Sequence, residues 1–386
     1  MRLRTTIALT LLLVTGVVAA QSSAWRWGGS FTDRAMTLLI LGDIQIHSRR
    51  PDPMTAFVNL RDTLQRADLV YANLEGTLVP SQGPDGDIPD KKGWTHPGQA
   101  APAVLKASNI RVVGVANNVA YGPKNILETL RVLDAQGIAH AGGGRNLDEA
   151  HKPAIVERKG VKIGFLQYTA RWYRDNEQIA TASAPGVARI LSTDGVTIDP
   201  GDLERLRADV RTLRPQVDIV VVSHHNRDGG TPVQFGAAPE RTAASGRADR
   251  TKSEEYQKQF AHVALDTGAD LVFGHGTHTV QGVEIYKGKP ILYAIGHSAF
   301  DQPGYEDSKD GFVVRAVIQA KQLLRVSFVP VTRDARNNVV MLDPSSEEGA
   351  RLIGIVKKVS GDVALKIDGQ EVVLLDRAAS TTTARR

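Results

Sequence analysis

The chain has 386 residues, 42% hydrophobic and 23% charged, which is typical of a globular protein with one large domain or two ordinary ones. It contains no cysteine, which excludes disulfides, zinc-thiolate sites and thiol nucleophiles, so any metal must be bound by His, Asp, Glu or Asn. The net charge of +5 suits a polyanionic ligand or an anionic membrane surface. The basic residues are scattered and match no nucleic-acid-binding motif, so we expect no nucleic-acid partner.

The N-terminal residues follow the three-part plan of a secretory signal peptide. MRLR precedes an uncharged apolar stretch from about Ile7 to Val18, and the small residues Ala19 and Ala20 suit a signal peptidase. The apolar stretch is short for a membrane span of roughly 20 residues. We therefore expect residues 1–20 to be a signal peptide and the mature protein to be exported, either periplasmic or extracellular. Membrane association through an uncleaved N-terminal segment is the alternative.

Short apolar runs alternate with amphipathic helical patterns, which is the sequence form of an α/β fold. Strands are expected at residues 37–41, 69–72, 110–116, 153–156, 161–166, 217–222, 269–273, 283–286, 291–295, 312–318 and 323–329. Helices are expected at residues 57–66, 203–213 and 254–267, and in a segment that begins at Pro123 and ends at Gly137. From Thr332 onward the pattern is less regular, and residues 378–386 are expected to form a disordered tail.

Polar side chains that can bind metal follow the carboxyl ends of five separate strand candidates. They are Asp43, Glu75, Asn118, His225 and His275. If these strands are parallel neighbours in one sheet, their C-terminal loops meet at one edge, where open α/β sheets bind ligands. Carboxylate, carboxamide and imidazole groups are the ligand set that a carboxylate-bridged pair of divalent metals requires. The sequence therefore predicts a metal site at this edge.

Each of these residues also has an ordinary structural interpretation. Gly-Asp after a strand is a common turn, which would account for Asp43. Asn118 lies before a helix that begins with proline and could be a turn or cap residue. Glu75 could be a solvated loop charge, and His225 or His278 a surface histidine. The metal-site prediction depends on these strand endings meeting in space; if they scatter, a plain extracellular structural domain is the remaining interpretation.

Six sequence blocks follow one another in order: LGDIQ, ADLVYANLEGTL, VANN, GGGRNLDEAHKPAIVERKGVKIGFLQYT, VVVSHH and GADLVFGHGTHTVQGVEIYKGKPILYAIG. Together they resemble the CapA family of bacterial proteins, which are linked to poly-γ-glutamate capsule synthesis and related to calcineurin-like metallophosphoesterases. The resemblance implies a CapA-like domain over residues 36–331, followed by a C-terminal extension over residues 332–377. It also implies a four-layer α/β/β/α metallophosphatase sandwich, in which helices cover two β-sheets and a dinuclear metal site lies at one sheet edge.

The resemblance also implies a set of metal ligands, carried over residue by residue. The set is Asp43, Glu75, Asn118, His225, His275 and His278. Within it, Glu75 matches the carboxylate expected to bridge the two ions. His224, the neighbour of His225, is the alternative ligand at that position and a second catalytic candidate. The implied cofactor is two divalent metal ions, and Mn, Fe and Zn all suit these ligands.

Several positions depart from the family pattern. Val119 replaces the histidine of the family's Asn-Asn-His motif, and a valine can neither donate nor accept a proton. Gln45 stands where the broader superfamily has a metal-binding histidine. His297 stands where the family has asparagine and follows the strand predicted at 291–295, so it is a candidate for the proton transfer that Val119 cannot perform. A histidine packed beside Phe300 is the alternative.

Basic side chains near the predicted site suit an acidic substrate. Arg171 and Arg174 flank Trp-Tyr after the block GFLQYT, and arginine binds carboxylates in bidentate fashion. Lys92 and His96 lie in the loop after Glu75 and are further candidates for substrate binding. An ordinary loop with a partly buried tryptophan is the structural alternative for the Arg-Trp-Tyr-Arg stretch.

These features predict an exported metal-dependent hydrolase of the phosphoesterase or γ-glutamyl amide hydrolase type. Its expected partners are an anionic capsule polymer such as poly-γ-glutamate, or a phosphorylated envelope precursor, and other capsule-synthesis proteins at the membrane. The alternative is a catalytically degenerate envelope protein that binds or guides an acidic polymer, which the substitutions at Val119 and Gln45 favour.

Overall fold

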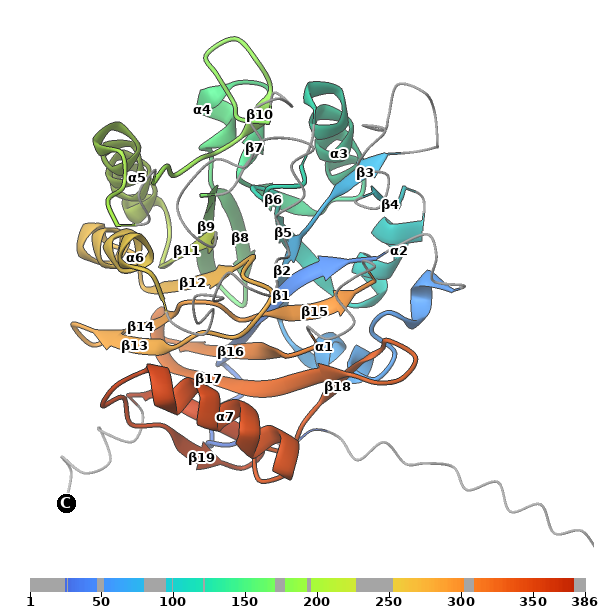
Figure 1. The fold of residues 1–386 in the computed structure, drawn as a ribbon, viewed down its shortest axis with the longest axis vertical. Helices are drawn as coiled ribbons and strands as arrows, with labels where there is room; N and C mark the ends of the chain where they lie inside the picture. The colour runs from blue at the N-terminus through green and yellow to red at the C-terminus, as the bar shows by residue number, and fades with distance from the viewer. Residues whose placement is uncertain are drawn as a thin grey trace, which may run out of the picture.

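A computed structural model of the chain is shown as a ribbon in Figure 1. It describes residues 25, 27–46, 52–79, 95–98, 100–120, 122–170, 178–192, 196–226, 253–301 and 309–377. The expected signal peptide, the expected tail and the candidate residues Lys92, Arg171 and Arg174 lie outside the described residues. Among the helices formed by the described part of the chain, none is long and apolar enough to cross a membrane.

The larger of the two main sheets has ten strands. Their bounds are β1 Met36–Gln45, β2 Leu69–Leu74, β5 Ile110–Gly114, β6 Ala139–Ala141, β15 His297–Phe300, β16 Gly311–Gln319, β17 Gln322–Arg333, β18 Val339–Met341, β19 Lys366–Asp368 and β20 Glu371–Asp376. The order is β19-β20-β17-β16-β1-β2-β5-β6, with β15 paired to β1 and β18 paired to β17. The strands β1, β2, β5 and β6 are parallel neighbours, so their carboxyl ends share one edge.

The smaller main sheet has six strands in the order β13-β14-β12-β11-β9-β8. Their bounds are β8 Ala154–Arg158, β9 Val161–Thr169, β11 Ile219–His225, β12 Leu271–His275, β13 Val283–Tyr286 and β14 Lys289–Leu292. The four central strands are parallel, and β8 and β13 close the two edges as antiparallel hairpin partners. Two short ladders pair β3 Thr77–Val79 with β4 Thr95–Pro97 and β7 Gly143–Gly144 with β10 Gly186–Val187.

Helices cover the outer faces of both sheets (Figure 1). The larger sheet is covered by α1 Arg61–Arg66, α2 Ala100–Ala107 and α3 Pro123–Ala135, and the smaller one by α5 Pro200–Leu213 and α6 Glu255–Thr267. The remaining α-helices of the described residues are α4 Leu147–Ala150 and α7 Glu347–Val359. The helix predicted at residues 57–66 is shorter than expected, because a 3-10 turn at Pro53–Thr55 and further turns precede Arg61. Pro123 opens α3 and Gly137 follows its end in a left-handed conformation, as predicted.

Three buried apolar clusters separate the layers. Between the sheets, Tyr71 of β2 stacks on Phe165 of β9 with ring centroids 5.4 Å apart. A second cluster packs the outer face of the larger sheet against α1, α2 and α3. A third packs the outer face of the smaller sheet against α5 and α6, for example through Leu206 and Phe260. The predicted four-layer α/β/β/α sandwich is confirmed.

The chain changes sheets between β14 and β15. The strand predicted at 291–295 is β14 only as far as Leu292, and a new strand, β15, begins at His297 in the larger sheet. There β15 runs parallel to β1, with the Cα atoms of Asp43 and His297 in register. This crossing places His297 beside the first strand of the chain.

The C-terminal extension is more regular than its sequence suggested. The boundary expected at residue 331 falls inside β17, and β20 pairs with β17, so residues after 332 enlarge the larger sheet. Ser346 caps α7 by accepting a hydrogen bond from the backbone of Gly349. The helix adds Leu352 and Val356 to the apolar cluster between the sheets. In Figure 1, α7 and β19 lie in red beyond β17.

A buried ion cluster fastens β20 to β16 and β17. The carboxylate of Glu371 is 2.7 Å from Nη2 of Arg325 and 3.1 Å from Nη1 of Arg315. Ser327 donates a hydrogen bond of 2.6 Å to the same carboxylate. Glu371 is fully buried, and Arg325 and Arg315 are 1% and 7% exposed. These charges must remain paired, because an uncompensated buried ion is costly.

Candidate metal centre

The predicted ligands meet where strands of the two main sheets end. Asp43 lies near the end of β1, Glu75 follows β2, and His225 and His275 end the neighbouring strands β11 and β12 in register with each other. With Asn118, these side chains are all 3% exposed or less. Asp43 is not a turn residue: β1 continues past it, with a register irregularity between Leu41 and Asp43. The strand ends converge rather than scatter.

A first potential metal-binding group consists of Asp43, His225 and His275. Nδ1 of His275 lies 3.3 Å from Oδ1 of Asp43, and Nδ1 of His225 lies 4.0 Å from the same oxygen. The two Nδ1 atoms face each other at 2.8 Å. One carboxylate oxygen and two imidazole nitrogens therefore converge on one buried point.

Asn118 and Glu75 lie on the other side of the His225 ring, near its Nε2 atom. Nε2 of His225 lies 2.7 Å from Oδ1 of Asn118 and 3.9 Å from Oε1 of Glu75. Among the described residues, Asp43 is the residue common to both potential metal-binding groups, and Glu75 belongs to neither. The bridging role that the family resemblance gives to Glu75 stays a prediction.

A second potential group consists of Asp43, His278 and His297. Nδ1 of His278 faces Nε2 of His297 at 2.5 Å. The ring of His297 stacks on Phe300, with centroids 3.9 Å apart and an interplanar angle of 8°. The sequence offered packing beside Phe300 as the alternative to a functional role for His297. In the structure, His297 packs beside Phe300 and also directs a ring nitrogen at His278.

Gly276 makes room for the ring of His225. Its φ is +89°, and a Cβ atom added to it would lie 2.7 Å from Nε2 of His225. A side chain at this position would therefore strain the backbone and collide with the imidazole at once.

We expect Gly276→Ala to displace His225 and weaken metal binding. The backbone strain alone should lower the free energy of unfolding by about 1–3 kcal/mol. Thermal unfolding with and without added Mn²⁺ or Zn²⁺ measures both effects. Gly354→Ala is the matched control: this glycine lies in α7 with no atom within 4 Å of an added Cβ, so the change should stabilise by about 0.5–1 kcal/mol. A Gly276→Ala protein with unchanged metal affinity would contradict the expectation.

A chain of carboxamides holds Asp43 in place. The backbone N–H of Ala116 donates to Oε1 of Gln167 at 2.7 Å, which fixes the orientation of that carboxamide. Nε2 of Gln167 then donates to Oδ1 of Asn73 at 2.8 Å and lies 3.0 Å from Nε2 of His275. Asn73 in turn donates to Oδ1 of Asp43 at 2.8 Å. Gln167 therefore supports ligands of both sheets.

Sequence reasoning did not identify Gln167 as part of the site. The sequence nevertheless indicates such a role. Gln167 is a polar residue within the apolar strand GFLQYT, and Asn73 is one within LVYANL. A polar side chain in a buried strand needs a buried hydrogen-bond partner.

Asp43 is held as an anion. Burial raises the pKa of its carboxyl, but the hydrogen bond with His275 and the charges of His275, His225 and His297 outweigh burial and lower it well below the usual range. The backbone N–H of Gly276 adds a hydrogen bond of 2.9 Å to Oδ2. An ionised carboxylate of this kind is a suitable ligand for a divalent cation.

His224 does not reach this cluster. Successive side chains of a strand point to opposite faces, and His224 stacks on Phe260 of α6 with ring centroids 4.5 Å apart. Burial, together with the charge of His275, lowers the pKa of His224 to about 3, so the ring is neutral at physiological pH. Of the two adjacent histidines, the structure turns His225 inward and His224 toward α6.

His96 supports the backbone beside the cluster. Its Nδ1 accepts a hydrogen bond of 3.2 Å from the N–H of Ile46, and its Nε2 lies 3.1 Å from the carbonyl oxygen of Glu75. The ring is 1% exposed. This placement links the segments that follow β1 and β2 and differs from the substrate contact expected of His96. Val119, next to Asn118, is fully buried.

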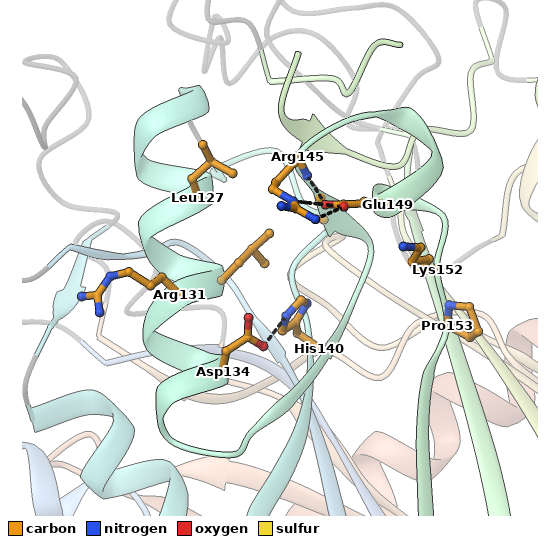
Figure 2. Close-up of a pocket in the computed structure, with 11 residues that line it drawn as sticks. Leu127, Arg131, Asp134, His140, Arg145, Glu149, Lys152 and Pro153 are labelled. Atoms are coloured by element: carbon orange, nitrogen blue, oxygen red, sulfur yellow. Dashed lines mark hydrogen bonds and ion pairs between the residues drawn. The ribbon is translucent and has the colours of Figure 1, made fainter. Parts of the chain in front are cut away.

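A separate cavity of about 540 Å³ lies between α3 and the segment that carries β7 and α4. Figure 2 shows two interacting pairs of side chains in it, His140 with Asp134 and Arg145 with Glu149. The distances are 3.1 Å for Nε2 of His140 to Asp134 and 2.8 Å for Nε of Arg145 to Glu149. Glu149 offsets the charge of Arg145, and Glu128 that of Arg131, which also lines the cavity.

The residues at the strand ends fit a divalent metal ion. A carboxylate, a carboxamide oxygen and several imidazoles are the ligands that Mn, Fe and Zn share. In two places ring nitrogens face each other, at 2.8 and 2.5 Å. Each pair requires either that one nitrogen carries a proton and donates it to the other, or that both nitrogens bind a common cation. The sequence prediction of an Asp/His metal site is confirmed to the extent that such groups exist among the described residues.

Comparisons with known proteins identify the family to which the chain belongs. Residues 37–302, more than half of the chain, match the family model "Bacterial capsule synthesis protein PGA_cap". A "PGA biosynthesis protein CapA" of Bacillus subtilis is 24% identical over 326 residues, covering 80% of this chain and 76% of that protein. A "Probable polyglutamine synthesis accessory protein" of Mycobacterium tuberculosis is 29% identical over 283 residues, covering 71% and 64%. An uncharacterized protein of Sinorhizobium fredii is 26% identical over 309 residues, covering 69% and 66%.

The chain spans slightly less than two thirds of the length of the Sinorhizobium and Mycobacterium relatives. Among solved structures, a hypothetical protein from Thermus thermophilus is similar with a TM-score of 0.46 and 14% identity, covering 76% of this chain and 98% of that chain. A purple acid phosphatase from yellow lupin has a TM-score of 0.39 and 9% identity, covering 80% and 53%. TM-scores this low carry no argument about the fold. The match over residues 37–302 shows that the chain belongs to the bacterial capsule synthesis protein family PGA_cap, as its resemblance to CapA proteins predicted.

Proposed function

We propose that this protein is an exported, metal-dependent hydrolase that acts in the synthesis or processing of an anionic capsule or envelope polymer such as poly-γ-glutamate. The bond it cleaves is a phosphoester or a γ-glutamyl amide. Its proposed partners are that polymer or a phosphorylated precursor, and other capsule-synthesis proteins at the membrane. Export is tested by N-terminal sequencing of the protein recovered outside the cytoplasm, where a start near Gln21 is expected.

The observation that carries the proposal is the buried convergence of Asp43, His225 and His275 at the ends of strands from both sheets. The carboxylate is ionised and bonded through both of its oxygens, to Asn73 and to the N–H of Gly276. Buried ionisable groups with shifted pKa values cluster at functional sites, and Asp43 is such a group. The family membership and the names of the relatives direct the proposal toward capsule polymers.

In the proposed centre, two divalent ions are bound, and Mn, Fe or Zn suit the ligands. When bound, they would supply Lewis-acid polarisation of the scissile group and an activated water. The protein's own residues hold the site: Asp43 supplies negative charge, and His225 and His275 supply imidazole ligands. Gln167, on β9 of the smaller sheet, supports Asp43 of the larger sheet through Asn73, and its Nε2 lies 3.0 Å from Nε2 of His275. The depth of burial excludes bulk water from the ligands.

A second candidate function is binding of an acidic polymer without catalysis. Val119 favours it, because this fully buried apolar side chain follows Asn118 and cannot transfer a proton to a leaving group.

Metal analysis and turnover measured on the same preparation distinguish the two functions. We expect the purified protein to contain about two equivalents of metal and to hydrolyse a generic phosphodiester or poly-γ-glutamate in a metal-dependent manner. His275→Ala should abolish turnover. His140→Ala is the control, since His140 lies beside Asp134 in the cavity between α3 and β7. Metal-free wild-type protein that binds the polymer would refute the hydrolase and support the binding function.

A further inference from the structure

We infer that His297 is a metal ligand that completes a second cation position with His278 and Asp43, rather than a proton-transfer group. This inference deepens the proposed metal-dependent function and rests on it. The ion would be a divalent cation that accepts imidazole and carboxylate ligands, such as Mn²⁺, Fe²⁺ or Zn²⁺. One ligand atom from each of the three residues lies within 4.8 Å of the others, and all three side chains are buried.

The backbone places His297 against Asp43 by unusually close packing. The N–H of Asp43 donates to the carbonyl of Gly296 at 3.1 Å. A Cβ atom added to Gly42 would lie 2.1 Å from that carbonyl oxygen, and one added to Gly311 would lie 1.9 Å from the carbonyl oxygen of His297. Only glycine permits β1, β15 and β16 to approach this closely. The position of His297 is therefore fixed by the sheet itself.

The two imidazoles are oriented from separate elements toward one point. His297 lies flat on Phe300, which restricts the rotation of its ring. His278 follows β12 of the other sheet and has a φ of +59°, a left-handed conformation that is uncommon for residues other than glycine. Strain of this kind is retained where a side chain must be held in a particular place. Nδ1 of His278 and Nε2 of His297 consequently meet at 2.5 Å.

The neighbours of His297 favour ligation over proton transfer. A proton-transfer group must direct a nitrogen at the reacting atoms, whereas Nε2 of His297 is directed at Nδ1 of His278, 2.5 Å away. His297, His278 and the carboxylate of Asp43 each place a ligand atom within 4.8 Å of the others, and carboxylates and imidazoles are ligands that Mn²⁺, Fe²⁺ and Zn²⁺ share. Gln45, two residues after Asp43 in β1, offers only a carboxamide, so His297 supplies a second imidazole to this group beside that of His278.

Metal binding by the full-length protein tests this role with a readout other than activity. His297→Gln keeps the approximate size and removes the imidazole. After equilibrium dialysis against Mn²⁺, we expect wild type to bind two equivalents and His297→Gln to bind one. Loss of a residue that only hydrogen-bonds to a metal ligand typically lowers metal affinity by about 10–100-fold, so loss of a ligand should lower it at least as much. Mn²⁺ EPR should change from a spin-coupled pair to an isolated ion. His278→Gln should behave in the same way.

His151→Gln is the matched control, because His151 is a buried imidazole that bonds Asp209 at 2.7 Å, away from both groups. It should retain two equivalents and the coupled signal, and circular dichroism should show all variants folded. If folded His297→Gln retains two equivalents with unchanged affinity, the ligand role is wrong while the proposed metal centre stands. If wild type binds no metal at all, the proposed function fails and this inference fails with it.

Discussion

Asp43→Asn should remove both metal ions and lower turnover at least about 1000-fold, which corresponds to roughly 4 kcal/mol of lost transition-state stabilisation. Asp43 belongs to both potential metal-binding groups that the described residues form. An asparagine keeps the size of the side chain but removes its charge. Its NH₂ group would also face a donor, since Asn73 and the N–H of Gly276 each donate to one carboxylate oxygen. The substitution therefore affects both positions at once, unlike the loss of any single histidine.

Metal analysis and kinetics on one preparation of Asp43→Asn measure this effect. Asp62→Asn is the control: Asp62 is exposed in the first turn of α1, where loss of its charge should change stability by less than about 1 kcal/mol and leave metal content unchanged. Two equivalents of metal in folded Asp43→Asn would show that Asp43 is not the shared ligand. Glu75 would then be the next residue to replace.

Glu371→Gln should lower the free energy of unfolding by about 3–5 kcal/mol, because it leaves buried charge without its partner. Arg325 keeps Asp368 and Asp376 at 2.6 and 3.0 Å. The ion pair recorded for Arg315 among the described residues is the one with Glu371. Burial lowers the pKa of the Arg315 guanidinium, and the charge of Glu371 opposes that effect. The predicted loss of stability therefore comes mainly from Arg315, whose buried charge loses its carboxylate partner.

Urea unfolding at constant m-value measures the change. Glu157→Gln is the control, because Glu157 is exposed on β8 and its charge should matter little. The double variant Glu371→Leu with Arg315→Met should be less destabilised than Glu371→Gln alone, since replacing both partners removes the unpaired charge. A loss below about 1 kcal/mol for Glu371→Gln would mean that Arg315 finds another partner.

The ends of the strands could be predicted from the sequence because apolar runs and the polar residues after them are local features. Asp43, Glu75, Asn118, His225 and His275 were all expected at one edge of one sheet. The structure brings them together, but from two sheets: the first three lie at or after the ends of strands of the larger sheet, and the two histidines end strands of the smaller sheet. The choice between His224 and His225 was also within reach, because alternate residues of a strand face opposite sides. The resemblance to CapA proteins supplied the number of layers, which periodicity alone does not give.

The remaining features depend on distant contacts. Gln167 acquires its role from partners 94 and 108 residues away in the chain. The position of His297 depends on the crossing from β14 to β15, which looks like a single strand and its loop in the sequence.

The helix α7 was missed for a different reason, because the signals for it are local. Ser346, an acidic first turn and the basic residues Lys357 and Lys358 all indicate a helix here.

The first potential metal-binding group draws one ligand from each of three strands in two sheets, so no single sheet can assemble it. Asp43 comes from β1 of the larger sheet, whereas His225 and His275 come from β11 and β12 of the smaller one. An ion bound there fastens one half of the sandwich to the other. Its binding free energy would resist separation of the halves, by about 4.1 kcal/mol at a metal concentration 1,000 times Kd. Loss of metal and parting of the sheets would then be one event, and the rate of metal exchange would report how often the sandwich opens.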